Sequence, residues 1–262
     1  MAKGARGGQR GKVASLASTI SQTAQAVAET EADTTSKATK FDKDYRDFLK
    51  MTEDERIDAV AQAITEDVPA HLSNTDFQKV LYNLEFNDKP DVVDEKTLDS
   101  MNGTEMFRTV NSVYDRQHDI NYTPKDIAQQ IQTGSTTRTS DNGGSAYGRG
   151  IYFAKSYDDS IRYGSSNNDI SKTAVVRAKL NSNAKIINYT YAVAGVNKEI
   201  NSGTKLGKML QKVDGASKSS IYALVKGYNV VDNGYGYIVV LNRKAMTMSK
   251  DIRPSHGYGK GW

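Results

Sequence analysis

The segment Tyr147–Ala154 constrains the fold more than any other part of this chain. Its first half carries two glycines on either side of an arginine, and glycine reaches backbone conformations that other residues avoid. Its second half, Ile151-Tyr152-Phe153, has the apolar and aromatic residues that favour a strand. Ser156 then suits the N-cap of a helix over residues 156–163, whose first turn is acidic. A glycine turn, a strand and a helix in this order let the backbone approach a flat aromatic ligand closely.

Eight residues of this region share their identities and spacing with a known signature: Gly148, Gly150, Ile151, Tyr152, Phe153, Ala154, Ser160 and Tyr163. The signature is that of the ADP-ribosyltransferase superfamily, and the chain resembles its PARP-like and diphtheria-toxin-like branch. The resemblance implies an NAD site in which Tyr152 and Tyr163 stack on the nicotinamide ring, because a cationic ring gains from stacking and cation–π attraction. It also implies that Ser160 and the Gly150 backbone fix the ring, with Gly148 and Phe153 in the same site. The alternative is a buried strand and an amphipathic helix whose tyrosines are core residues.

A second strand is predicted over residues 105–110, and it carries Arg108. An arginine on a buried strand needs a partner. In the arginine-using branch of the superfamily, the first core strand carries an arginine that contacts the phosphate and ribose of NAD. The resemblance implies this catalytic and binding role for Arg108, with Thr109 beside it, and a guanidinium fork suits phosphate. The polymerase-like branch has histidine and glycine here, so the chain combines features of two branches. The alternative is a strand arginine that faces solvent.

The hairpin predicted around Asn233-Gly234 lacks a carboxylate that the superfamily carries. In the family a glutamate precedes the Tyr-Ile-Val strand, binds the ribose 2′-hydroxyl and stabilises the cation formed when the glycosidic bond breaks. Here Gly236 stands at that position, and losing one such contact slows chemistry by about 100- to 1000-fold. Asp232 could substitute only if the hairpin folds it inward. The resemblance therefore implies mono-ADP-ribosylation, or NAD binding without transfer, rather than polymer synthesis.

The remaining elements of this half are predicted from local patterns. Thr123-Pro124 starts a helix that ends at Gly134, and a loop rich in hydroxyls and glycine follows over residues 135–144. By resemblance the loop closes over the adenosine side of NAD, and Ser135 and Arg149 line the rim, although Arg149 could equally point into solvent. Further strands are expected at 173–180 and 184–188 and on both sides of the hairpin turn, and helices at 190–200, 205–213 and 217–226.

The first hundred residues match no family and are interpreted from composition. Residues 1–40 are predicted to be a flexible tail, basic over 1–12 and polar afterwards, and the basic part could contact a polyanion or simply be solvated. Residues 41–103 are predicted to form a small helical lobe. Its helices are a first with a Thr52/Glu55 capping box that ends at Pro69, a second over about 75–84, and a third from Asp94 to Gly103.

Composition excludes several classes of chemistry. The 262 residues contain no cysteine, which removes disulfides, thiolate metal sites and cysteine nucleophiles. The three histidines, at 71, 118 and 256, lack metal-ligand spacing, so no metal site is expected. No apolar run is long enough to span a membrane, and no secretory signal is recognised at the start.

The sequence therefore predicts an α+β fold, with a split antiparallel β-sheet and flanking helices over residues 104–262 behind the helical lobe. The predicted function is mono-ADP-ribosyltransferase, with NAD as co-substrate and a protein acceptor, although a nucleic-acid acceptor is equally compatible. The chain is also similar to ADP-ribosyltransferases encoded by bacteriophages. Two alternatives stay open: a module that binds NAD or ADP-ribose without transfer, and a phage structural or packaged protein that contacts nucleic acid through residues 1–12.

Overall fold

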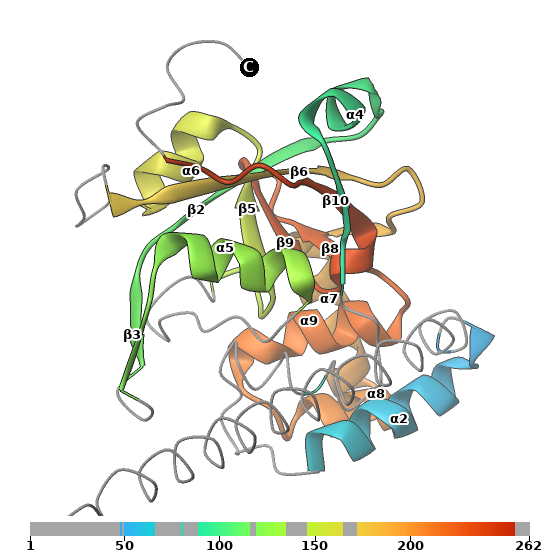
Figure 1. Cartoon of the computed structure of the whole chain (residues 1–262). Coiled ribbons are helices and arrows are strands. Elements are labelled where there is room, and N and C mark those ends of the chain that lie inside the picture. Colours follow the sequence, from blue (N-terminus) through green and yellow to red (C-terminus); the bar gives the residue numbers. More distant parts are fainter. Residues whose placement is uncertain are drawn as a thin grey trace, which may run out of the picture. The chain divides into compact units, whose positions relative to one another are not determined.

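The computed structural model describes residues 48, 50–65, 80, 89–115, 119–134, 146–164 and 172–254. All of them belong to one compact unit that spans Asp44–Trp262 (Figure 1). The predicted tail over 1–40, the loop over 135–144 with Ser135, and all of the predicted helix over 75–84 except Val80 lie outside the described residues.

A mixed sheet of nine strands organises this unit. Its order is β1 (Asp91–Val93), β10 (Met246–Ser249), β6 (Ala174–Leu180), β2 (Glu105–Val110), β5 (Ile151–Ala154), β9 (Tyr237–Val240), β8 (Val230–Asp232) and β7 (Ile186–Asn188), and β11 (Arg253–Pro254) also pairs with β6. Two short strands, β3 (Val113–Asp115) and β4 (Ile120–Tyr122), form a separate ribbon. Together with seven α-helices in the described part, the sheet confirms the α+β class.

The sheet is not antiparallel throughout, in contrast to the prediction. The pairs β1/β10 and β7/β8, at its two edges, are parallel. Parallel neighbours need a long crossover, and three helices supply it between β7 and β8: α7 (Tyr189–Asn201), α8 (Lys205–Leu210) and α9 (Gly215–Val225). In the centre, β2 and β5 share a single register pair, Phe107 with Ala154. The sheet therefore nearly divides between these two strands.

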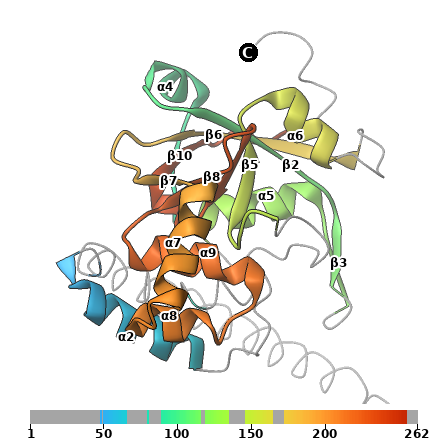
Figure 2. The ribbon, with the colours of Figure 1, turned by 180° about the vertical axis from the view of Figure 1, so that it is seen from behind.

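Helices cover both faces of the sheet. One apolar core holds α7, α8 and α9 together with α2 (Glu53–Thr65) against Ile187, Val231 and Val239 (Figure 2). The alternate residues of the same strands, such as Ile238 and Val240, face a second core that contains the buried side of α5 (Pro124–Thr133; Figure 1). Two shorter helices, α4 (Glu95–Ser100) and α6 (Tyr157–Gly164), lie beside β10 and β2 respectively, and the short turn η2 (Arg243–Ala245) precedes β10.

The helix ends follow the capping residues in the sequence. The predicted capping box is confirmed at Thr52 and Glu55, whose side chains each bond to the other's backbone N–H. Asp94 caps α4, and Gly134 ends α5 with a φ of 79°. Strand β1 lies within the region predicted to be helical. No helix of the described part has the length and apolar character that a membrane span requires.

Candidate functional site

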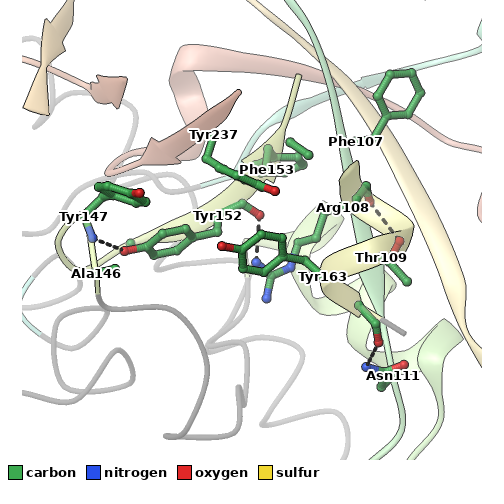
Figure 3. A pocket seen from close by; sticks show the side chains of 14 residues that line it. Phe107, Arg108, Thr109, Asn111, Ala146, Tyr147, Tyr152, Phe153, Tyr163 and Tyr237 are labelled. Carbon is green, nitrogen blue, oxygen red and sulfur yellow. Dashed lines mark hydrogen bonds between the residues drawn. The ribbon is translucent and has the colours of Figure 1, made fainter. Parts of the chain in front are cut away.

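A pocket of about 230 Å³ lies where β2 and β5 diverge (Figure 3). Seven of its lining residues were predicted from the sequence as site residues: Arg108, Thr109, Gly150, Tyr152, Phe153, Ser160 and Tyr163. Seven others were not predicted: Phe107, Asn111, Ala146, Tyr147, Ala154, Gly164 and Tyr237. The fold therefore brings strand β2, the turn before β5, strand β5, helix α6 and the start of β9 to one cavity.

Arg108 lies at the dividing point of the sheet. Just past the one pair that joins β2 to β5, its Nη1 donates to the backbone carbonyl of Tyr152 at 2.8 Å. Its Nε is buried and has no hydrogen-bond partner, and no carboxylate among the described residues pairs with the guanidinium. Burial, followed by repulsion from nearby Arg243, lowers the pKa of Arg108 to about 10. Among the described residues, the cation in this pocket therefore has no counter-ion.

Arg243 adds positive charge behind the pocket but is itself held by the protein. Its side chain is 1% exposed, and its Nη1 donates to the carbonyls of Gln130 and Ile131 near the end of α5. Carbonyls at a helix C-terminus attract cations. Arg243 therefore belongs to the packing of α5, while Arg108 is the arginine at the pocket.

The four tyrosines of the pocket come from the turn before β5, from β5, from α6 and from β9. The hydroxyl of Tyr152 donates to the carbonyl of Gly148 at 2.6 Å and accepts from the backbone N–H of Tyr147 at 3.1 Å. Burial raises the pKa of the Tyr152 phenol above its usual value. Tyr163 is 64% exposed and meets Tyr237 edge to face, with ring centroids 4.5 Å apart (Figure 3). Together these rings form an aromatic rim that remains partly open.

Two side-chain contacts hold helix α6 against strand β2. The hydroxyls of Thr109 and Ser160 are 2.8 Å apart, and Nδ2 of Asn111 donates to the carbonyl of Gly164 at 2.6 Å. A side chain at position 164 would collide with Thr109, so only glycine allows this close approach. These contacts fix α6 against β2 at one wall of the pocket.

The turn before β5 packs against helix α9. Gly148 and Gly150 have φ values of 106° and 147°, which glycine adopts without strain. Gly150 lines the pocket, whereas a Cβ at Gly148 would lie 2.5 Å from Oγ of Ser220 on α9. Arg149 does not line the rim and does not face solvent: its guanidinium lies 3.6 Å from Asp214, and its side chain is 15% exposed. Both predictions for Arg149, a place at the rim and a side chain in solvent, are therefore wrong.

Asp232 is turned away from the role considered for it. Its carboxylate accepts from Nζ of Lys155 at 2.7 Å and from the backbone N–H of Gly234 at 2.8 Å, and it is not among the pocket residues. Gly236, with a φ of 103°, precedes Tyr237 of the pocket, and a Cβ there would lie 3.7 Å from Oδ2 of Asp159. The carboxylate that approaches position 236 therefore comes from α6.

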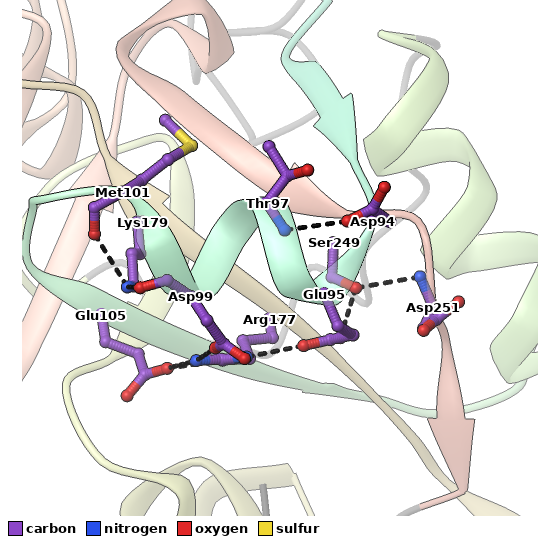
Figure 4. A network of polar contacts seen from close by, with 10 residues as sticks. All are labelled: Asp94, Glu95, Thr97, Asp99, Met101, Glu105, Arg177, Lys179, Ser249 and Asp251. Atoms are coloured by element: carbon purple, nitrogen blue, oxygen red, sulfur yellow. Dashed lines mark hydrogen bonds and ion pairs between the residues drawn. The ribbon is translucent and has the colours of Figure 1, made fainter.

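Arg177, a buried arginine on the neighbouring strand β6, is paired with carboxylates (Figure 4). Arg177 is 5% exposed, and its guanidinium contacts Glu95 at 2.6 Å, Asp99 at 2.7 Å and Glu105. Glu95 also accepts from the hydroxyl of Ser249. This network joins α4 to the sheet, and it shows by contrast that Arg108 is without the carboxylates that normally accompany a buried arginine.

Comparisons with protein-family models, with curated proteins and with solved structures find no match to this chain. Among the described residues, no cluster of three or more histidines, cysteines and acids could hold a metal ion. The described part of the site offers a guanidinium without a carboxylate partner, the hydroxyls of Thr109 and Ser160, and a rim of tyrosines.

Proposed function

We propose that the pocket binds NAD and that the protein is a mono-ADP-ribosyltransferase, which transfers ADP-ribose to a macromolecular acceptor and releases nicotinamide. The unpaired guanidinium of Arg108 carries this proposal. A buried cation without a partner is costly, and a bound anion offsets that cost. The planar fork of Arg108 suits the oxygens of a phosphate, with Nε as a donor that the protein leaves unused.

The rest of the pocket suits the nicotinamide half of the dinucleotide. Tyr152 and Tyr163 come from β5 and α6 and offer aromatic surface to a cationic ring, and Ser160 offers a hydroxyl for its carboxamide. The volume of about 230 Å³ is below the roughly 300–1,000 Å³ of pockets that enclose a drug-sized ligand, so it suits only part of NAD. The adenosine half would lie outside this cavity.

The sheet supports the finer fold assignment, an ADP-ribosyltransferase-like split sheet. The division falls between β2 and β5, where a single residue pair joins the strands, and both strands contribute to the pocket. A cleft between two half-sheets would expose strand backbone and side chains to a ligand on both sides. This assignment rests on the resemblance in the Tyr147–Tyr163 segment together with that division.

A second function is favoured by one specific observation: no acidic side chain lines the pocket among the described residues. Cleavage of NAD benefits from negative charge near the ribose. A module that binds NAD or ADP-ribose without transfer needs none. The two functions share Arg108 and the tyrosine rim and differ only in chemistry.

The test measures binding and chemistry separately. Calorimetry gives the affinity for NAD and for nicotinamide riboside, which lacks phosphates, and nicotinamide release is followed with protein and nucleic-acid acceptors from a cell extract. Arg108→Gln should weaken NAD binding by about 10- to 100-fold, because hydrogen bonds to charged groups contribute about 1.5–3 kcal/mol. It should weaken nicotinamide riboside binding much less, because the riboside lacks the phosphates. Lys125→Gln, at an exposed position on α5 that does not line the pocket, is the matched control.

Three outcomes distinguish the proposals. Nicotinamide release that Arg108→Gln abolishes and Lys125→Gln preserves supports the transferase. NAD binding with the same dependence on Arg108 but without release supports the binding module. Absence of NAD binding by the wild-type protein refutes both.

A further inference from the structure

The proposed transfer needs negative charge at one particular place. The bond between nicotinamide nitrogen and ribose C1′ breaks, its electron pair stays with the nitrogen, and neutral nicotinamide leaves. Positive charge then develops on C1′ and the ring oxygen, until water or the acceptor's nucleophile bonds to C1′ and gives its proton to solvent. Arg108 opposes this charge, and none of the described lining residues is acidic. A carboxylate just behind the lining would therefore matter.

Four carboxylates belong to elements that line the pocket or neighbour it: Glu105 on β2, Asp158 and Asp159 on α6, and Asp232 on β8, the strand beside β9. Glu105 is paired with Arg177. Asp232 is neutralised by Lys155, with 2.7 Å between Nζ and Oδ2. Asp158 is exposed in the first turn of α6. Asp159 is partly buried and lies next in sequence to Ser160, whose side chain lines the pocket.

Asp159 has one weak cationic partner among the described residues. Its Oδ2 accepts from the hydroxyl of Ser156 at 2.7 Å, and the guanidinium of Arg162 lies 3.8 Å from its Oδ1 and is exposed to solvent. Such a solvent-exposed pair is weak. On the side of β9, Gly236 contributes no side chain beside the carboxylate, and a Cβ there would stand 3.7 Å from it.

Asp159 also acts electrostatically on a residue of the pocket. Tyr237 lines the pocket, and its pKa is raised first by burial, then by Tyr163 and by the carboxylate of Asp159. Arg162, the partner of Asp159, acts on the Tyr237 pKa in the opposite direction. At this wall of the pocket, the ring of Tyr163 meets the ring of Tyr237.

We propose that Asp159 supplies the negative charge that stabilises the ribosyl cation when nicotinamide leaves. The inference rests on the function proposed above, and it makes the acid on α6 the electrostatic centre of a site whose β9 position holds Gly236. Asp159 has a structural role as well, because its backbone N–H donates to Ser156 Oγ and its carboxylate accepts from the same hydroxyl at the start of α6. The experiment must separate this capping role from catalysis.

The variant Asp159→Asn keeps an oxygen acceptor for Ser156 but removes the charge. With water as acceptor, nicotinamide release at saturating NAD should fall by about 100-fold or more, whereas the NAD dissociation constant should stay within about threefold. Asp158→Asn removes the same charge from the same helix turn and should change neither quantity. Ser156→Ala removes the capping hydroxyl, keeps the carboxylate, and should retain nicotinamide release.

The outcomes separate this inference from the function on which it rests. A wild-type protein that releases no nicotinamide overturns the transferase and the role of Asp159 with it. Release by the wild type that continues at full rate in Asp159→Asn overturns the role of Asp159 alone. Equal losses in Asp159→Asn and Ser156→Ala would show that only the helix cap matters, which also overturns it.

Discussion

Replacing Arg108 with methionine should make the ligand-free protein more stable, although the substitution removes a charged side chain from the middle of a sheet. The pKa of Arg108 lies at about 10, and the fall from its usual value corresponds to roughly 3 kcal/mol, since one pKa unit is worth about 1.4 kcal/mol. The substitution also removes the hydrogen bond to the Tyr152 carbonyl, worth about 1 kcal/mol. The net gain expected is therefore about 2 kcal/mol.

The pH dependence of this stability difference follows from the direction of the pKa change. The folded protein holds the Arg108 proton less tightly than the unfolded chain does, so the penalty is complete below about pH 10 and decreases as the pH rises through about 10. At pH 7 the whole difference should be measurable. For a unit of this size, about 2 kcal/mol corresponds to a rise in Tm of roughly 4–8 °C, measured by calorimetry without ligand.

The same substitution at Arg177 is the control, because its sign should be opposite. Arg177 lies on the adjacent strand β6, next to Val176, which pairs with Arg108 in the sheet register. Arg177→Met leaves three carboxylates together without their cation, and breaking such a buried pair costs about 3 kcal/mol or more. A fall in Tm for Arg108→Met, similar to that for Arg177→Met, would refute the conclusion that Arg108 is unpaired.

Two further variants test the turn before β5 and Tyr152, and a third variant, on α9, is the control for the glycine substitution. Gly150→Ala should lower the unfolding free energy by about 2 kcal/mol or more in urea, because φ is 147° and the new Cβ would lie 2.7 Å from the Val240 carbonyl. Gly215→Ala, which meets nothing within 4 Å, should raise it by up to about 1 kcal/mol. Tyr152→Phe should cost about 1–3 kcal/mol, because it leaves the Gly148 carbonyl without its donor. Burial raises the Tyr152 pKa, so wild-type stability should fall as the pH rises above about 10, and urea titrations should show that the deficit of Tyr152→Phe shrinks there.

The helix starts could be predicted because each capping contact joins residues that are close in sequence. Thr52 and Glu55 are three residues apart, as are Asp94 and Thr97, and both pairs form as the sequence indicates. Strand β1 could not be predicted in the same way. It has three residues, two of them exposed, and its partner strand begins at Met246, so only the assembled sheet makes it a strand.

The candidate site could likewise be predicted only where its residues belong to local patterns. Arg108 and Tyr152 were expected in one site, and they line one pocket because β2 and β5 are neighbours. Tyr237 was missed because its position depends on the pairing of β9 with β5, although its place directly after Gly236 was a signal. The approach of Asp159 to Gly236 joins residues from α6 and the start of β9, and no local pattern reveals it.

The two arginines on adjacent strands differ in how the protein compensates their charge. On β6 the chain surrounds Arg177 with three acids and thereby joins α4 to the sheet. On β2, next to it, Arg108 donates to a backbone carbonyl and to no carboxylate in the described part of the chain, while Thr109 and Asn111 tie the same strand to α6. Strand β2 is thus firmly held on one side and carries an uncompensated charge at its junction with β5. An apolar residue at this position, or an acid beside it, would be more favourable for stability, and we therefore propose that a bound anion offsets the charge of Arg108.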